Sequence, residues 1–347
     1  MSSSKRKRTH SYSAQQPASI KDIARIAGVS HSTVSRALQN SPLVQPGTRE
    51  EIQRIAREVG YRASAVARGL VTRKTRTIGV VVTTVIDPWV GEVLSAIELA
   101  AADHGYAVFL ADSNADPVRE KMVVQSFAER RVDGIVVTSS RVGALHTPML
   151  SEMMVPMVLI NNQHPGEFVH SVMIDNLQAS REATGHLLSL RHRRIGYVGD
   201  QFGHHSDAER FAGYREALQR AATPFLAELV VHGDGKSEGG TAAMNQLLKL
   251  AAPPTAVFCY NDMTALGALR AIHAHGLRVP ADISVVGFDD LFFAPYTLPP
   301  LTTVRQPRRE MGRMALESLL KLMAGEEPAE IRVPAELIVR ESTAAPG

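Results

Sequence analysis

The sequence predicts two kinds of fold in one chain: an N-terminal all-α helix-turn-helix headpiece and an α/β body of two doubly wound subdomains. Apolar residues recur at helical spacing between residues 19 and 59, whereas short apolar runs alternate with amphipathic segments from residue 78 onward. The charge divides at the same place. Residues 1–77 contain 15 Lys or Arg and 4 Asp or Glu, which gives a net charge of +11. Residues 78–347 contain 23 Lys or Arg and 31 Asp or Glu, which gives a net charge of −8. The basic head is therefore expected to bind a polyanion, and nucleic acid fits best because a membrane anchor also needs an apolar face.

Length and composition exclude several classes of protein. A chain of 347 residues is too long for one ordinary core, so two or three domains are expected. The sequence contains no run of about eighteen apolar residues, so a membrane span is not expected. The basic cluster at residues 5–8 is not followed by the apolar stretch of a secretory signal. The single cysteine, Cys259, has apolar neighbours, which predicts a buried thiol and excludes a disulfide scaffold or a cysteine metal site. A reducing, cytoplasmic location fits this cysteine usage.

The N-terminal segment is predicted to divide into a tail and an ordered headpiece. Residues 1–18 are polar, basic and poor in apolar side chains, and are expected to be a disordered tail. The headpiece, residues 19–62, begins at Ser19, which together with Asp22 resembles a capping box. Gly28 is predicted to end this first helix in the left-handed backbone region.

The next two helices complete a helix-turn-helix pattern. Ser30 is predicted to cap a second helix over 31–38, and a third is predicted near 46–59. A second helix of this kind enters the major groove of DNA, where Arg36 can donate two hydrogen bonds to guanine. The alternative is a small helical bundle with a solvated polar face, which the charge of +11 disfavours.

The segment at residues 63–77 predicts a marginal helix and a basic connector. Ser64 is placed to cap a helix over 65–70, which is too short to be stable alone in water. It has few large apolar side chains, and most of its other residues are small, such as alanine. Such a helix needs a partner surface in order to form.

Three stretches resemble one known family. They read "IKDIARIAGVSHSTVSRALQNSPLVQPGTREEIQRIAREVGYRASAVARGL", "PTAVFCYNDMTALGALRAIHAHGLRVPADISVVGFDDL" and "LPPLTTVRQPRREMG". These stretches resemble the LacI/GalR family of bacterial transcription regulators, and the resemblance covers nearly the whole chain after residue 18. It implies a homodimer that binds a pseudo-palindromic operator on double-stranded DNA and responds to a small-molecule effector.

The resemblance also implies which residues contact DNA. In this family the short helix after the headpiece is a hinge helix that folds on DNA against its twin, and it levers a leucine into the minor groove. The sequence departs from many members at Ala63, where they have proline, so the hinge is expected to be less rigid. The DNA-binding residues expected here are Ser19, Ile20, Ser30, His31, Ser32, Thr33, Ser35, Arg36, Ala67 and Leu70.

Strand and helix patterns alternate through the body, residues 78–347. Strands are expected at 78–85, 106–111, 134–138, 157–160, 195–199, 256–260 and 283–288, and helices at 90–104, 118–130, 176–190, 206–221, 238–250, 262–275 and 307–324. This alternation predicts parallel sheets with helices on both faces, and ligands bind such sheets at the carboxyl ends of the strands. The resemblance implies a fold like that of periplasmic binding proteins, with chain crossings near residues 175, 305 and 335, and assigns this body to effector binding and dimerisation.

Signatures of catalysis and of metal or cofactor binding are absent from the sequence. The stretch 235–237 ends like a phosphate loop, but the earlier glycine that this loop requires is Val230. The neighbours His204 and His205 point apart in a helix or strand and have no acidic partner pattern, so a loop pair is favoured over a metal site. We therefore expect no enzyme, no cofactor and no metal.

The remaining chemistry lies in loops that follow the predicted strands. Trp89, the only tryptophan, is suited to stack on a sugar ring, although a core position is an equal alternative. The resemblance implies that Arg210 and Asp289 clamp the effector from opposite sides. The expected effector-binding residues are Asp87, Trp89, Asn161, Asn162, Arg210, Asn261, Asp262 and Asp289, with His164 and Phe202 as weaker candidates. For Asp262, a structural role at a helix start is an equal alternative.

These observations predict a dimeric repressor with a sugar or glycoside as inducer. A purine-type corepressor is the alternative effector, and a solute-binding protein without a regulatory role is the alternative function. A solute-binding protein would need a signal peptide and no basic head, whereas a sugar-processing enzyme would need paired carboxylates or a nucleotide loop. No heptad helix follows the last predicted helix, which favours a dimer over a tetramer.

Overall fold

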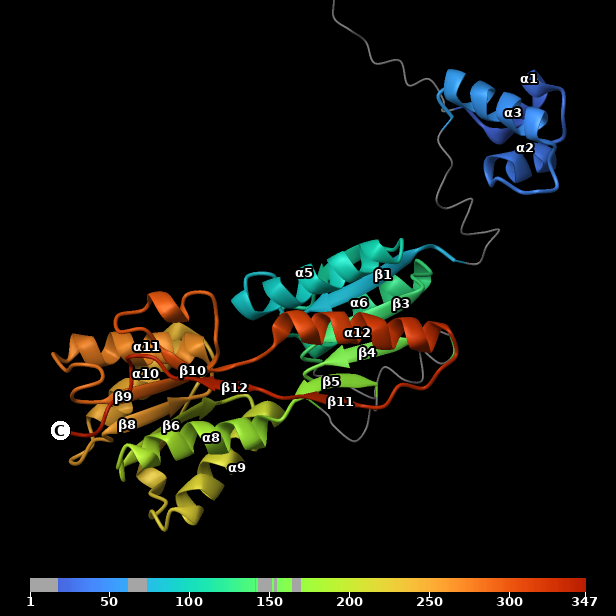
Figure 1. Cartoon of the computed structure of the whole chain (residues 1–347). Coiled ribbons are helices and arrows are strands. Elements are labelled where there is room, and N and C mark those ends of the chain that lie inside the picture. Colours follow the sequence, from blue (N-terminus) through green and yellow to red (C-terminus); the bar gives the residue numbers. More distant parts are fainter. Residues whose placement is uncertain (1–17, 62–73, 141, 143–151, 153–154, 164–169) are drawn as a thin grey trace, which may run out of the picture. The chain divides into compact units, whose positions relative to one another are not determined.

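The computed structural model describes residues 18–61, 74–140, 142, 152, 155–163 and 170–347. The chain divides into two compact units, Met1–Thr75 and Arg76–Gly347 (Figure 1). The expected tail before Ala18, the expected hinge residues Ala63, Ala67 and Leu70, and the weaker pocket candidate His164 lie outside the described residues.

The first unit is built from three helices: α1 (Ile20–Ala27), α2 (His31–Leu38) and α3 (Pro46–Glu58). Ser19 and Asp22 form the predicted capping box, and Gly28 ends α1 with φ of 64°. The hydroxyl of Ser30 caps α2 by accepting a hydrogen bond from the backbone N–H of Thr33 at 3.1 Å. The three helices enclose a small apolar core formed by Ile23, Ala24, Val34, Ala37, Val44, Ile52, Ile55 and Ala56.

The second unit contains two six-stranded sheets in its described residues. The first sheet has the order β11-β5-β4-β3-β1-β2, and the second the order β12-β10-β9-β8-β6-β7. Neighbouring strands are parallel throughout, except that β12 runs antiparallel to β10. The strands are β1 (Thr77–Val82), β2 (Ala107–Asp112), β3 (Gly134–Thr138), β4 (Met157–Ile160), β5 (Ser171–Ile174), β6 (Ile195–Asp200), β7 (Val230–Gly233), β8 (Ala256–Cys259), β9 (Ser284–Asp289), β10 (Thr302–Arg305), β11 (Ile331–Val333) and β12 (Glu336–Ile338).

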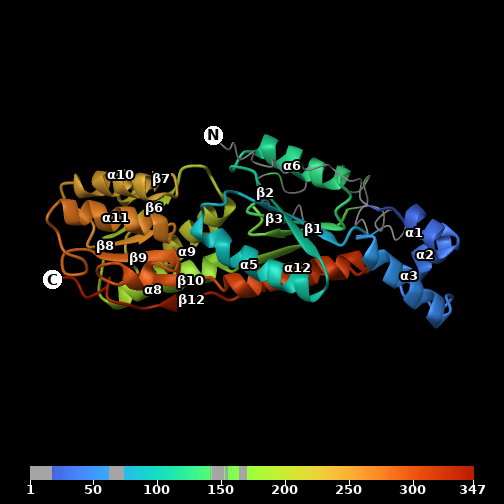
Figure 2. The same ribbon diagram turned by 90° about the horizontal axis from the view of Figure 1, so that it is seen from above.

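Helices cover both sheets (Figures 1 and 2). The first sheet is packed by α5 (Pro88–Asp103), α6 (Pro117–Glu129) and α12 (Arg308–Met323), and α12 also packs along α5. The second sheet is packed by α8 (Asn176–Ser189), α9 (His205–Arg220), α10 (Ser237–Leu248) and α11 (Asp262–Ala274), in which α8 pairs with α9 and α10 with α11. Short 3₁₀ turns lie at Ala227–Leu229 and Ala294–Tyr296.

The chain passes between the two subdomains at three places. It leaves the first sheet after β5 and enters α8, returns between β10 and α12, and leaves again between β11 and β12. One apolar cluster includes side chains from both subdomains, among them Trp89, Met311, Tyr197 and Phe288. The crossings therefore bring residues that are distant in the sequence into one place.

Several strands fall where the sequence pattern predicts none. Strands β5, β7, β10, β11 and β12 contain three or four residues each, and unlike the equally short β4 and β8 none of them is an unbroken apolar run. The first strand ends at Val82, whereas the apolar run 78–85 predicts a longer one. No helix within the described ranges is long and apolar enough to cross a membrane.

Candidate DNA-binding helix and effector site

Helix α2 presents a polar face and a buried face. Val34 and Ala37 are buried in the headpiece core. The predicted DNA-contacting residues His31, Ser32 and Arg36 are exposed, whereas Thr33 and Ser35 are half-buried, as is Ile20 on α1. The hydroxyl of Ser30 lies 2.8 Å from the hydroxyls of both Ser32 and Thr33, so the start of α2 carries a connected group of hydroxyls.

Arg36 has no acidic partner within the described residues, in contrast to two other arginines of the headpiece. Arg25 pairs with Asp22 at 2.5 Å, and Arg54 pairs with Glu51 and Glu58 at 2.6 Å each. Among the residues that the structure describes, Arg36 has no side-chain hydrogen bond or ion pair that would have to break before the guanidinium contacts another molecule.

Arg210 lies buried where the second sheet meets the first chain crossing. Its Nε donates a hydrogen bond to Oδ1 of Asn176 at 3.0 Å, and its Nη1 donates to the carbonyl oxygen of Tyr260 at 2.5 Å. The guanidinium carbon lies 3.6 Å from the ring centroid of Phe288 and 4.7 Å from that of Tyr260. Two aromatic rings and two hydrogen bonds thus fix the orientation of the cation.

Asp289 lies at the carboxyl end of β9 and is buried. Its Oδ1 accepts a hydrogen bond from Nε2 of Gln306 at 2.5 Å. Burial raises the pKa of Asp289 to about 6, although the cations of Arg210 and Arg308 act in the opposite direction. The carboxyl group therefore changes charge close to neutral pH.

Trp89 connects the first subdomain to Asp289. It lies in the first turn of α5, where Oδ1 of the N-cap Asp87 accepts a hydrogen bond from its backbone N–H at 2.9 Å. The side chain is 6 % exposed, and its indole Nε1 donates to Oε1 of Gln306 at 3.1 Å. One glutamine amide therefore joins Trp89 to Asp289 across the second chain crossing. Burial raises the pKa of Asp87.

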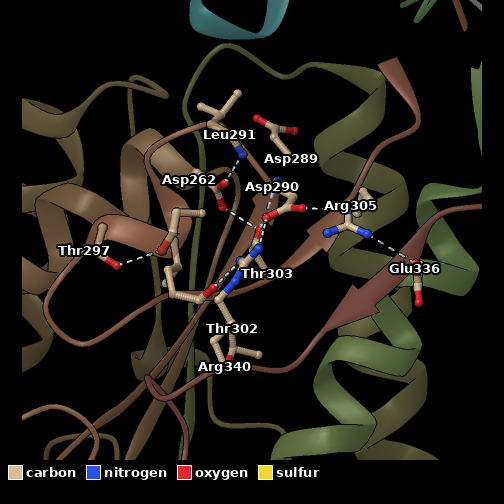
Figure 3. A network of polar contacts seen from close by, with 12 residues as sticks. Asp262, Asp289, Asp290, Leu291, Thr297, Thr302, Thr303, Arg305, Glu336 and Arg340 are labelled. Carbon is tan, nitrogen blue, oxygen red and sulfur yellow. Dashed lines mark hydrogen bonds and ion pairs between the residues drawn. The ribbon is translucent and has the colours of Figure 1, made fainter. Parts of the chain in front are cut away.

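The other predicted effector residues occupy loops after β4 and β8. Asn161 is half-buried with φ of 52°, and Asn162 is buried. Asn261 caps α11 by accepting a hydrogen bond from the N–H of Thr264 at 2.8 Å. The buried carboxylate of Asp262 accepts hydrogen bonds from the Thr303 hydroxyl at 2.5 Å and the Leu291 N–H at 2.7 Å (Figure 3). Asp262 thus binds the chain after β9 directly.

A second polar group follows β6. Nδ1 of His204 lies 2.8 Å from Oδ2 of Asp200, and the His204 ring stacks against Tyr260 with a centroid distance of 6.5 Å. Nε2 of His205 lies 3.4 Å from Oε1 of Glu209, so the two histidines have different acidic partners. Phe202, in the same loop, is exposed. No group of three potential metal ligands occurs within the residues that the structure describes.

Sequence reasoning missed several residues of this site. Asn176, Tyr260, Phe288 and Gln306 directly contact the predicted Arg210 or Asp289. The available signal was their position at strand ends and chain crossings. Gln306, for example, directly follows β10. No pattern in the sequence indicates that Gln306 contacts a residue more than two hundred positions away.

Comparisons with known proteins agree with this architecture. Residues 19–64 match the family model "Bacterial regulatory proteins, lacI family", and residues 184–343 match "Periplasmic binding protein-like domain". The chain is 38 % identical over 330 residues to the HTH-type transcriptional repressor CytR of Escherichia coli strain K12, covering 94 % of this chain and 97 % of CytR.

Solved structures show the same fold. The Lac repressor dimer bound to operator and the anti-inducer ONPF has a TM-score of 0.86 at 29 % identity, covering 95 % of this chain and all of that one. The complex of the transcriptional regulator CelR with cellobiose has a TM-score of 0.71 at 33 % identity, covering 94 % of this chain and 99 % of that one. The chain belongs to the LacI family and is a DNA-binding transcriptional regulator, not an enzyme, with a periplasmic-binding-protein-like domain for a small-molecule effector.

Proposed function

We propose that this regulator is a repressor, that it binds a pseudo-palindromic operator as a homodimer, and that a sugar or small glycoside releases it from DNA. The name of its relative CytR and the operator-bound dimer of the Lac repressor support the first two points. The cellobiose complex of CelR supports a carbohydrate effector. A protein of this kind acts in the cytoplasm, where bacterial DNA lies.

The surface of α2 supports the DNA-binding part of the proposal. Helix α2 enters the major groove, and Arg36 contacts guanine while Ser32 and Ser35 make smaller contacts. Ser30, His31 and Thr33 at the start of α2, and Ser19 and Ile20 at the start of α1, are the further DNA contacts of the headpiece. Leu70 inserts into the minor groove from the hinge, with Ala67 beside it.

Asp289 carries the effector part of the proposal. A buried carboxyl group opposite a fixed arginine, Arg210, gives a hydrogen-bond acceptor and a donor that suit vicinal hydroxyl groups. Asp87, Trp89, Asn161, Asn162, Asn261 and Asp262 are the further effector contacts of this proposal. Each follows the carboxyl end of a strand in the chain, and open α/β sheets bind ligands at that end.

Exposed apolar side chains on the body support a dimer. Strand β2 lies at the edge of the first sheet, and its Phe109 and Leu110 are 47 % and 43 % exposed. Val118 and Met122 on the adjacent α6 are also exposed. An unprotected apolar edge of this kind favours association with a second copy.

The proposal is tested by titrating the protein onto genomic fragments and then onto a fluorescent duplex of about two helical turns. D-ribose, D-galactose, cellobiose and hypoxanthine are added in turn. We expect salt-sensitive binding that at least one sugar weakens. Tighter binding with hypoxanthine would instead identify a purine-type corepressor. The repressor proposal is abandoned if no genomic fragment is bound.

A further inference from the structure

The turn after β9 has an unusual backbone. Asp289 and Asp290 are adjacent residues with positive φ, 119° and 54°. Residues other than glycine rarely adopt this conformation, and two in succession persist only where surrounding contacts hold them. Asp289 is also the carboxyl group on which the proposed effector binding depends. The contacts that hold this turn therefore decide where that carboxyl group lies.

Contacts from the second subdomain hold one side of the turn (Figure 3). The carboxylate of Asp290 accepts hydrogen bonds from Nε of Arg305 at 2.7 Å and from Nη2 of Arg340 at 2.6 Å. The carboxylate of Asp262 accepts the N–H of Leu291. These residues all belong to the second sheet and its loops, so they fix the turn within its own subdomain.

Arg308 holds the turn from the other subdomain. It is the first residue of α12, which packs on the first sheet, and its side chain is buried. Its Nη1 donates a hydrogen bond to the carbonyl oxygen of Asp289, and its Nη2 donates to that of Asp290 at 2.8 Å. The same Nη2 lies 2.8 Å from Oε1 of Glu92 on α5. One guanidinium thus joins the strained turn to α5.

Arg308 and Gln306 form two separate connections between the turn and α5. The first joins the backbone of Asp289 to Glu92, and the second joins its side chain to Trp89. Both contacts end in the first turns of α5. Helix α5 follows β1, the first strand after the segment that connects the body to the DNA-binding unit.

We propose that Arg308 is a positioning residue that couples the Asp289–Asp290 turn to α5, so that a ligand that displaces the turn also displaces α5. This inference rests on the proposed role of Asp289 in effector binding. A buried guanidinium that loses its partners is unfavourable. If the turn moved while Glu92 stayed in place, Arg308 would lose one set of its hydrogen-bond partners while buried. The turn and α5 therefore move together.

The test compares Arg308→Lys with Arg309→Lys in the full-length protein. Arg309 is the matched control because it is the next residue on α12 and lies 3.9 Å from the same Glu92, yet it is exposed and has no contact with the turn. Lysine keeps the charge, but all of its N–H donors lie on one nitrogen, so it cannot reach two carbonyl oxygens and Glu92 as a planar guanidinium does. The readout is hydrogen exchange at the indole N–H of Trp89, the only tryptophan, so a single signal reports the site.

We expect Arg308→Lys to accelerate indole exchange by about tenfold or more, with a smaller change in the global unfolding constant measured in urea. Arg309→Lys should change neither by more than about twofold. Equal exchange rates in the two variants would refute the coupling. An equal loss of indole protection and of global stability in Arg308→Lys would show a purely structural role and would also refute it.

A second readout uses the compound among D-ribose, D-galactose, cellobiose and hypoxanthine that alters the operator affinity of the wild type. In Arg308→Lys this compound should still bind, while its effect on operator affinity falls by about tenfold. An undiminished effect would contradict the inference. If none of the four compounds acts on the wild type, the proposed effector class fails, and the indole exchange still decides the role of Arg308.

Discussion

At the level of single residues, Arg36 is the arginine that α2 exposes to solvent. Its guanidinium has no acidic partner within the described headpiece, whereas Arg54 is held between two glutamates. An unpaired guanidinium can donate two parallel hydrogen bonds to guanine without first breaking an ion pair. We therefore propose that sequence discrimination by α2 depends mainly on Arg36.

Replacing Arg36 by alanine is expected to weaken operator binding by about 1–3 kcal/mol and to relax the preference at one base pair. Fluorescence anisotropy with single-substituted duplexes measures both effects. Arg54→Ala serves as the control, and its effect should be smaller because its charge is already neutralised within α3. Uniform weakening over all duplexes would instead make Arg36 a phosphate contact.

Asp289 gives the proposed effector site a predicted pH dependence. Its pKa of about 6 means that the carboxyl group is ionised above this pH and protonated below it. Because the ionised form is the stronger acceptor of hydroxyl hydrogen bonds, affinity for a sugar should fall as the pH decreases from about 7 to about 5. Isothermal titration across this range measures the change.

Asp289→Asn should remove this pH dependence and bind the sugar more weakly at neutral pH. Asp282→Asn is the matched control, because Asp282 is exposed and its pair with Arg278 lowers its pKa to about 2. That carboxylate stays ionised throughout the range. An unchanged pH profile in Asp289→Asn would rule out this carboxyl group as the source.

At the level of elements, close contacts between helices decide how the subdomains are built. Helices α5 and α12 approach so closely that a Cβ atom at Gly312 would lie 2.6 Å from the carbonyl oxygen of Val93. This backbone contact cannot be relieved by a side-chain rotation. Glycine at this position therefore sets the distance between the two helices that Arg308 and Glu92 connect.

Gly312→Ala is expected to lower the free energy of unfolding by about 1–3 kcal/mol, measured by urea denaturation. Gly91→Ala on α5 is the control, because a Cβ atom there has no neighbour within 4 Å. In that open helical position alanine should be neutral or stabilising by about 0.5–1 kcal/mol. Equal effects of the two substitutions would show that the helix contact adapts at low cost.

The ends of the headpiece helices were predictable, and the short strands were not. A capping box, a left-handed glycine or an N-cap serine acts on residues within four positions, so the sequence itself contains both partners. Strand β11, for example, pairs with β5, although about 160 residues separate them in the chain. Their short local patterns therefore carry little information.

At the level of the whole molecule, the two units have separate cores. The headpiece encloses its own apolar cluster, and the body encloses three others. The division of charge follows nearly the same boundary, with the excess of basic residues in the first unit. Each unit therefore contains what its own stability requires.

A chain that begins at Arg76 should consequently fold and bind the effector but lose its affinity for the operator. Its thermal transition should match that of the body in the full-length protein, measured by calorimetry. Only the full-length protein should bind operator DNA, and this binding should weaken as salt increases, because the basic first unit releases counterions from the phosphates. A fragment that fails to fold, or that still binds DNA, would contradict the independence of the units.

The sequence by itself determined the helix-turn-helix, the α/β body, the division of charge and the exposed position of Arg36. Each of these depends on residue periodicity, composition or capping between neighbours in the chain. Only the tertiary structure decided that Trp89, Gln306 and Asp289 form one hydrogen-bonded series, and that Arg308 ties the strained turn to α5. The physical reason is that these contacts span chain crossings, and the packing of two sheets, which no local pattern encodes, sets which side chains meet there.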